Sequence, residues 1–301
     1  MSRVATIPMH RTLFDSIGRS QVKLAAAQVQ LATGKKAQDY AALGTETVRN
    51  LSARGLVARQ ESHALVANRL NTTLAIYDAN IGGIDTAVSS LRNELLTAIG
   101  TGRAAGLQEA VEAAFQQYRS ALNASEGGAP LFAGSRTDEK PFVPSTLAET
   151  AGLAAQDAFA NDDVRASARV ADGLDVQYGI TASQLGEGLF GAFRTLAEAG
   201  TIAEEPSPAQ IEALENAVNA IDQGLKQLRS VHAENGRHQQ QVETLGVRAE
   251  DRALVLKDLI SRNEDADMAK IASDLVQRRT VLEASYSAFA QLSGLSLVRF
   301  L

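Results

Sequence analysis

Hydrophobic residues recur at alternating steps of three and four positions along two long stretches of the chain. The first covers residues 74–95 and the second covers residues 211–259, where the register shifts by one position after His232. A repeat of about 3.5 residues over such a length is typical of a helix that packs along a partner, as in a coiled coil. The pattern therefore predicts two long helices, and the second is expected over residues 208–262.

The two ends of the chain carry weaker stripes of the same kind. One lies between Pro8 and Gly34, and the other begins at Met268. A stripe of about 30 residues with so few large apolar side chains is marginal as an isolated helix in water, so each segment is expected to need a partner and to be largely disordered in dilute monomer. The expected interface residues are Leu13, Ile17, Leu24, Leu31, Leu275, Leu282, Phe289, Leu292, Phe300 and Leu301.

The middle of the chain interrupts these long patterns. Helices are expected over residues 107–124 and 181–199, and Thr181 or Ser183 is the expected N-cap of the latter. Between them, residues 131–142 resemble an irregular loop and residues 147–159 a small helix. Asp172-Gly173 is a hairpin turn signal. These elements predict a small α+β segment between two helical arms.

The expected fold class is mainly α: a long antiparallel coiled-coil-like helical rod built from N- and C-terminal segments, with a small α+β insert in the middle. Three domains are expected. Residues 1–44 with 262–301 form a terminal-helix assembly domain, residues 45–128 with 200–261 form the helical rod, and residues 129–199 form the insert. Residues from opposite ends of the chain must therefore pair.

Composition removes several classes of protein. The 301 residues include no cysteine, which excludes disulfides, thiolate metal sites and a cysteine nucleophile. With 35 acidic and 29 basic residues the formal net charge is −6, which argues against a nucleic-acid partner. No apolar run approaches the roughly 18 residues of a membrane helix, and the N-terminus lacks the apolar stretch of a cleaved secretion signal. We expect neither nucleic acid nor membrane as a partner.

No pattern indicates catalysis or cofactor binding. Residues 186–191 spell GxGxxG, but no βαβ unit surrounds them, so a helix–helix contact through small residues explains them better. Residues 100–106 read as a turn between antiparallel helices. His232 and His238 are six positions apart and lack a third ligand. The acidic run at residues 264–267 lacks EF-hand spacing and fits the first turn of a helix. The sequence predicts no enzyme, no metal site and no cofactor.

Several short segments resemble the flagellin superfamily. Residues 31–36 (LATGKK) are similar to the turn that ends the first helix of that family, and residues 263–269 (NEDADMA) are similar to its E-D-A-D-x-A run. Residues 282–286 (LEASY) and 295–301 (LSLVRFL) follow its terminal helix. The resemblance covers about the first 125 and the last 95 residues. It implies that the terminal segments pair to form an inner tube.

Within the superfamily the middle segment favours one branch. Residues 131–138 (LFAGSRTD), followed by Pro141-Phe142, resemble the hook–filament junction branch, called hook-associated protein 3. The I-N-T-N opening of major flagellins is absent. The resemblance implies a structural subunit of the bacterial flagellum that joins hook to filament by polymerising through its paired terminal helices. The alternatives are a flagellin that forms the filament itself and a cytoplasmic coiled-coil adaptor.

The resemblance also implies partners and a location. The expected partners are further copies of the chain, a neighbouring hook-associated protein, flagellin, and an export chaperone that binds the C-terminal helix. The expected location is extracellular, in the flagellum, after export through the flagellar secretion apparatus without a cleaved signal peptide.

Overall fold

The computed structural model describes the backbone of residues 3–298 and the side chains of residues 11–41 and 43–291. Its contacts divide the chain into two units. The terminal unit comprises residues 1–59 and 252–301, and the central unit comprises residues 60–251. The insert expected over residues 129–199 falls inside the central unit, and its status as a separate domain stays a prediction.

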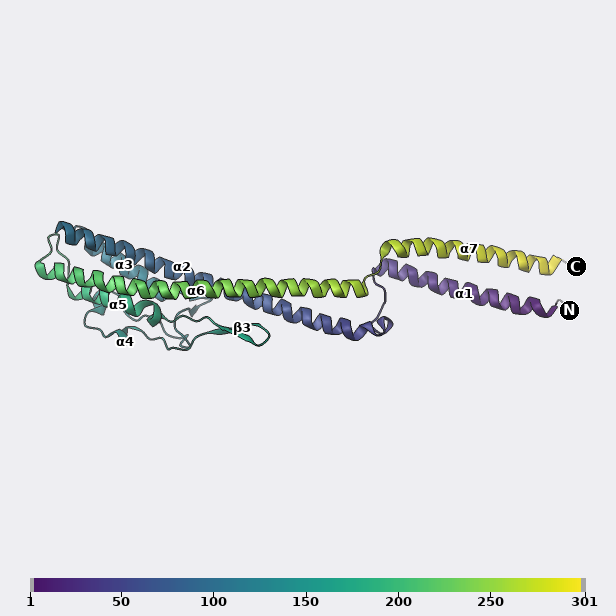
Figure 1. Cartoon of the computed structure of the whole chain (residues 1–301), viewed down its shortest axis with the longest axis horizontal. Coiled ribbons are helices and arrows are strands. Elements are labelled where there is room, and N and C mark those ends of the chain that lie inside the picture. The colour runs from purple at the N-terminus through teal and green to yellow at the C-terminus, as the bar shows by residue number, and fades with distance from the viewer. Residues whose placement is uncertain (1–2, 299–301) are drawn as a thin grey trace. The chain divides into compact units, whose positions relative to one another are not determined.

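Long helices account for most of the described chain (Figure 1), so the mainly α fold class with small sheets is confirmed. The long helices are α1 (Arg3–Thr33), α2 (Glu46–Thr101), α6 (Pro208–Glu264) and α7 (Met268–Val298), and two medium ones are α3 (Leu107–Leu122) and α5 (Ala182–Glu198). The helix expected over residues 208–262 is confirmed within two residues. Helix α1 begins before Pro8, earlier than expected. No described helix has the length and apolar character to cross a membrane.

The core of the central unit lies along α2 and α6, which run side by side there (Figure 1). All seven apolar positions of the α2 stripe are buried, as the periodicity predicts: Leu74, Tyr77, Ile81, Ile84, Val88, Leu91 and Leu95. Arg92 meets Asp222 of α6 at 2.5 Å, and Arg229 of α6 meets Asp85 at 2.7 Å. These ion pairs link α2 and α6 beside the apolar seam.

An aromatic cluster joins α3, α5 and the loop after α3. Its members are buried and include Phe115, Tyr118, Phe142, Phe190 and Phe193. The rings of Tyr118 and Phe193 lie 5.0 Å apart, and those of Tyr118 and Phe142 lie 5.2 Å apart in an edge-on arrangement. Aromatic pairs in such geometries contribute about 0.5–1.5 kcal/mol beyond their burial. The cluster fixes the loop after α3 against the helices.

The irregular segment contains two small sheets. Strands β3 (Ser167–Ala171) and β4 (Leu174–Gln177) form the expected hairpin, in which Gly173 has a φ of 70°. Strands β1 (Ser125–Glu126) and β2 (Ala129–Pro130) form a second hairpin that the sequence did not predict. Short helical turns occur at η1 (Ala41–Leu43), η2 (Ala148–Thr150) and α4 (Ala155–Ala158).

The single helix expected over residues 147–159 is wrong. Gly152 has a φ of +71°, a left-handed conformation that ends the first turn before the second begins. By contrast, the predicted cap of α5 is confirmed at Thr181, which forms a capping box with Gln184.

The glycines of the GxGxxG stretch serve helix packing. A Cβ on Gly186 would lie 2.5 Å from the hydroxyl of Tyr118, which donates a hydrogen bond to the Gly186 carbonyl at 2.9 Å. A Cβ on Gly188 would lie 3.1 Å from the Cα of Gly224 on α6. The expected helix–helix contact is confirmed for these two positions. Gly191 faces open space.

Candidate assembly interface

Helices α1 and α7 run antiparallel and pair with each other within the terminal unit (Figure 1). Among the side chains of α1 and α7 that the structure describes, the buried apolar ones are Ile17, Ala27 and Leu282, with 7–9% of their surface exposed. A seam with so few fully buried apolar side chains supplies little free energy against the entropy of ordering two long helices. The pair is therefore only weakly held by its own contacts.

The structure brings most of the predicted interface residues to this seam. Leu13, Leu24, Leu31, Leu275 and Phe289 are half-buried, in addition to the buried Ile17 and Leu282. The side chain of Leu292 and residues Phe300 and Leu301 lie outside the described part of the chain. Ala27 is buried in the seam but was missed, because a small side chain adds little to a hydrophobic pattern. The role of these residues in assembly stays a prediction.

A second apolar face on α1 was also missed. Phe14 and Val22 are 69% and 71% exposed, and an added Cβ at Gly18 between them would meet nothing within 4 Å. Positions 14, 18 and 22 follow a four-residue spacing, so they share one side of the helix, and the exposure of Phe14 and Val22 shows that α7 does not cover it. This four-residue spacing was the feature of the sequence from which the second face could have been predicted. On α7, Val276 is similarly exposed at 65%.

Exposed apolar side chains gather in the terminal unit. Twelve of the eighteen large hydrophobic side chains that are exposed among the described residues belong to it: Phe14, Val22, Tyr40, Val48, Leu51, Leu56, Leu254, Val255, Met268, Val276, Val281 and Tyr286. The central unit is the longer of the two and holds the other six. Exposed apolar side chains are therefore more frequent in the terminal unit than in the central unit.

Two segments from opposite ends of the chain meet at the base of α1 and α7. Residues 34–36 and 264–266 lie antiparallel, with a bridge between Lys35 and Asp265. The Lys36 amide donates to the Glu264 carbonyl at 2.7 Å, and the Ala266 amide donates to the Gly34 carbonyl at 2.9 Å. Gly34 has a φ of 68°, which lets the chain turn sharply after α1. We call this arrangement the helix-root clamp.

The clamp surrounds a buried carboxylate. Glu264, the last residue of α6, is 7% exposed and accepts two hydrogen bonds from Arg54 of α2, at 2.6 and 3.2 Å. Lys35 Nζ lies 3.7 Å from the same carboxylate and 2.5 Å from Asp265. The hydrogen bond between Lys35 and Asp265 raises the pKa of Lys35 and lowers that of Asp265, and the bond to Glu264 raises the pKa of Arg54.

These contacts correct the interpretation of the acidic run. Only Asp267 lies at the start of a helix, where its carboxylate accepts from the Lys270 amide at 3.0 Å. Glu264 ends a helix and Asp265 lies in the bridge, so the helix dipole does not explain either one. Their partners are far away in sequence, which is why spacing alone could not identify their role.

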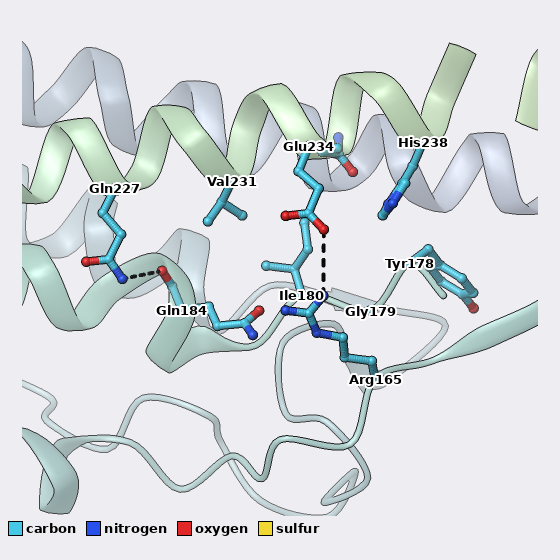
Figure 2. A pocket seen from close by; sticks show the side chains of 10 residues that line it. Arg165, Tyr178, Gly179, Ile180, Gln184, Gln227, Val231, Glu234 and His238 are labelled. Atoms are coloured by element: carbon cyan, nitrogen blue, oxygen red, sulfur yellow. Dashed lines mark hydrogen bonds and ion pairs between the residues drawn. The ribbon is translucent and has the colours of Figure 1, made fainter. Parts of the chain in front are cut away.

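A small cavity lies between α6 and the segments that flank the β3–β4 hairpin (Figure 2). Its volume is about 180 Å³. Arg165 and Glu234 face each other across it at 3.7 Å, and Gln227 donates to the Gln184 carbonyl at 3.3 Å (Figure 2). These two contacts tie the hairpin region and α5 to α6.

The histidines of α6 do not meet as ligands. His232 contacts Asp78 of α2 at 2.7 Å, whereas His238 borders the cavity. Among the described residues no group of three or more His, Cys, Asp or Glu side chains is placed to hold a metal ion.

Comparison with known proteins supports the resemblance to flagellins. Residues 218–301 match the family model of the bacterial flagellin C-terminal helical region. That range covers α7 and the later part of α6, including Glu264 and Asp265 of the helix-root clamp. The predicted resemblance to the flagellin superfamily is confirmed.

Full-length relatives are similar to the chain as a whole. The flagellar hook-associated protein 3 of Salmonella typhimurium is 22% identical, and that of Escherichia coli is 23% identical, each over 98% of both chains. The solved structure of a putative flagellar hook-associated protein from Vibrio parahaemolyticus covers 73% of this chain and 97% of its own, with a TM-score of 0.61 and 16% identity. These similarities favour the junction branch over a filament flagellin.

Proposed function

We propose that this chain is a structural subunit of the bacterial flagellum that joins the hook to the filament. It acts as a building block and not as an enzyme, and its location is the flagellum. The similarity to two curated hook-associated proteins over almost the whole chain supports this assignment. The observation that carries the mechanism is the concentration of exposed apolar side chains in the terminal unit.

Assembly proceeds by covering these exposed side chains. The Ile17 side of α1 packs on α7 within one subunit, whereas the outer face around Phe14 and Val22 packs on a neighbouring copy. Burial of such side chains contributes about 1.5–3 kcal/mol each, so a subunit gains order and stability together when it joins its neighbours. In dilute monomer the weak seam leaves α1 and α7 mostly unfolded, which prevents premature polymerisation.

The proposed position between the hook and the filament determines the expected partners. Further copies of the chain occupy the same ring, a neighbouring hook-associated protein and flagellin lie on either side, and an export chaperone covers the C-terminal helix before secretion. Val276 and Val281, which are 65% and 52% exposed on α7, give such a chaperone an apolar surface to hold. Export proceeds through the flagellar secretion apparatus without a cleaved signal peptide.

Immunogold electron microscopy of intact flagella tests the assignment. The antibody is raised against residues 129–199, which belong to the central unit and leave the terminal helices free to assemble. We expect one cluster of gold particles between the hook and the filament. Labelling along the whole filament would identify a flagellin instead. Absence of extracellular label would reject both readings and favour a cytoplasmic coiled-coil adaptor.

A further inference from the structure

The helix-root clamp joins the end of α6 to two other parts of the terminal unit, the early part of α2 and residues 34–36 after α1. Glu264 ends α6, and its partners Asn50 and Arg54 lie on α2, at 3.5 Å for Asn50 and 2.6 Å for Arg54. The backbone bonds of residues 264–266 hold residues 34–36. Helix α1 ends at Thr33, directly before Gly34 of the clamp, and α7 begins at Met268, directly after Asp267.

The surroundings of Glu264 make this contact hard to replace. Asn50 is completely buried, and its side-chain oxygen accepts a hydrogen bond from Asn263 at 3.0 Å. The Arg54 guanidinium also lies 6.0 Å from the ring of Tyr40, in the connection between α1 and α2. Neutralising the carboxylate would leave the buried amide of Asn50 and the half-exposed guanidinium of Arg54 without their charged partner. Loss of the partner of a buried polar group costs more than the loss of an exposed ion pair.

The apolar seam between α1 and α7 does not fix the register of the two helices as strictly as the clamp does. Its buried side chains within residues 11–291 are Ile17, Ala27 and Leu282, and contacts among small or aliphatic side chains permit slippage along the helices. A bidentate bond between a guanidinium and a carboxylate is directional and admits one geometry. The polar clamp therefore specifies where α1 ends and where α7 begins, and the apolar seam holds the two helices together once they are ordered.

We propose that Glu264 and Arg54 are positioning residues that hold the roots of both terminal helices side by side in the monomer, so that each subunit enters the assembly with its α1–α7 pair in one register. This inference rests on the proposed function, because the register matters when the helices pack against neighbouring copies. The clamp acts within one subunit and not on a neighbouring copy. Its effect on the distance between the roots of α1 and α7 is therefore measurable in the monomer, before any assembly takes place.

Distance measurements in the monomer test the clamp directly. The chain has no cysteine, so Ala32→Cys with Ala269→Cys introduces two spin labels, at exposed positions close to the roots of α1 and α7. Double electron–electron resonance should give one narrow distance distribution in the labelled parent. The distribution should broaden with Glu264→Gln, even if the outer parts of the helices are unfolded in both. A narrow distribution in Glu264→Gln, or a broad one in the parent, would overturn the proposal.

Two further variants separate positioning from a general loss of stability. Glu283→Gln removes an exposed ion pair with Arg279 on α7 that joins no two segments, and it should leave the distance distribution narrow. Arg54→Lys keeps the charge but loses the forked geometry, so it should broaden the distribution. Arg54→Lys combined with Glu264→Gln should be no broader than Glu264→Gln alone, because residues of one contact are not additive. An additive double variant would contradict a shared role.

The same variants are then followed in cells by the immunogold assay. Glu264→Gln should lower the fraction of labelled flagella by about tenfold, the effect of a change of about 1.4 kcal/mol in a binding equilibrium. A broadened distribution with normal labelling would overturn the positioning role and leave the proposed function intact. If the parent chain itself gives no label on flagella, the proposed function fails, and the monomer distances still decide whether the clamp exists.

Discussion

Gly188 of α5 and Gly224 of α6 approach so closely that a Cβ on Gly224 would lie 2.6 Å from the Gly188 carbonyl oxygen. Backbone atoms cannot give way as a flexible side chain can. The two helices of the central unit therefore cross at this point only because both positions lack a side chain. The crossing brings the aromatic cluster of α3 and α5 against the α2–α6 core.

Gly224→Ala should therefore destabilise the chain. Overpacking at a buried contact costs about 1–3 kcal/mol, and urea unfolding of the central unit followed by circular dichroism measures it. Gly236→Ala on the same helix is the matched control, because an added Cβ there meets nothing within 4 Å. That variant should be neutral or more stable by up to about 1 kcal/mol, since alanine favours a helix. Equal effects at both positions would contradict the close crossing.

Alanine variants of Gly134 and Gly152 test the close contact between Gly134, in the loop after β2, and Asp162. Gly134 has a φ of +68°, and a Cβ there would lie 2.1 Å from a carboxylate oxygen of Asp162, which also accepts from the Ser135 amide at 2.9 Å. Gly152 has a φ of +71° with open space around it. Both alanine variants pay the strain of a left-handed residue, about 1–2 kcal/mol, but only Gly134→Ala displaces Asp162. The urea midpoint should therefore fall further in Gly134→Ala than in Gly152→Ala.

The buried tyrosines should make the central unit sensitive to alkali. Burial raises the pKa of Tyr118 well above its ordinary value of 10.0, and the nearby Glu187 adds to the shift. The unfolded chain therefore releases this proton at a lower pH than the folded chain does. The stability contributed by the neutral hydroxyl is complete below pH 10 and is lost as the pH rises toward the folded pKa, at up to about 1.4 kcal/mol per pH unit.

Urea unfolding at pH 9 and at pH 11 measures this effect. The free energy of unfolding should fall less between these values in Tyr118→Phe than in the parent chain. Tyr286→Phe, at an exposed position on α7, should keep the parent's dependence. The chain contains five tyrosines and no tryptophan, so the difference in tyrosinate absorbance between the parent and Tyr118→Phe reports the ionisation of Tyr118. An early rise in absorbance from Tyr118, before unfolding, would contradict the burial of its hydroxyl.

Charge placed in the terminal seam should abolish assembly but not the central fold. Leu24→Asp and Leu282→Asp each put a carboxylate into the α1–α7 contact, where desolvation opposes it. We expect loss of gold label between hook and filament, while the thermal midpoint of the core built by residues 74–95 and 211–228 is nearly unchanged. Val143→Asp, at a 53% exposed site of the central unit, should leave both properties intact. A large fall of the thermal midpoint would place the leucines in the core instead.

The outer face of α1 makes a separate prediction. Val22→Asp changes an exposed residue, so the helicity and thermal midpoint of the monomer should not fall. Assembly should nevertheless fail, because the carboxylate would be buried against a neighbouring subunit. Normal labelling of flagella in this variant would exclude the Phe14–Val22 face from the interface between copies, while leaving the Ile17 seam unaffected.

Hydrophobic periodicity by itself determined the long helices of this protein. The stripe from Leu74 to Leu95 is local information, because residues that share one helix face are three or four positions apart, and all of it is buried as predicted. Thr181 and Gly173 likewise act on the residues beside them, so the cap of α5 and the β3–β4 turn could be predicted. The two motifs at residues 31–36 and 263–269 pointed to a family without revealing what they do.

Tertiary structure alone decided the relationships between distant residues. Glu264 binds Arg54, which is 210 positions away in the sequence. No spacing rule connects two residues so far apart, so the prediction that the acidic run interacts with a helix dipole was wrong for Glu264. The single helix expected around Gly152 is instead two short turns on either side of that glycine, and both turns contact α5. Local periodicity determines helices because their hydrogen bonds are local, whereas the helix-root clamp and the glycine crossing depend on chain segments that meet only after folding.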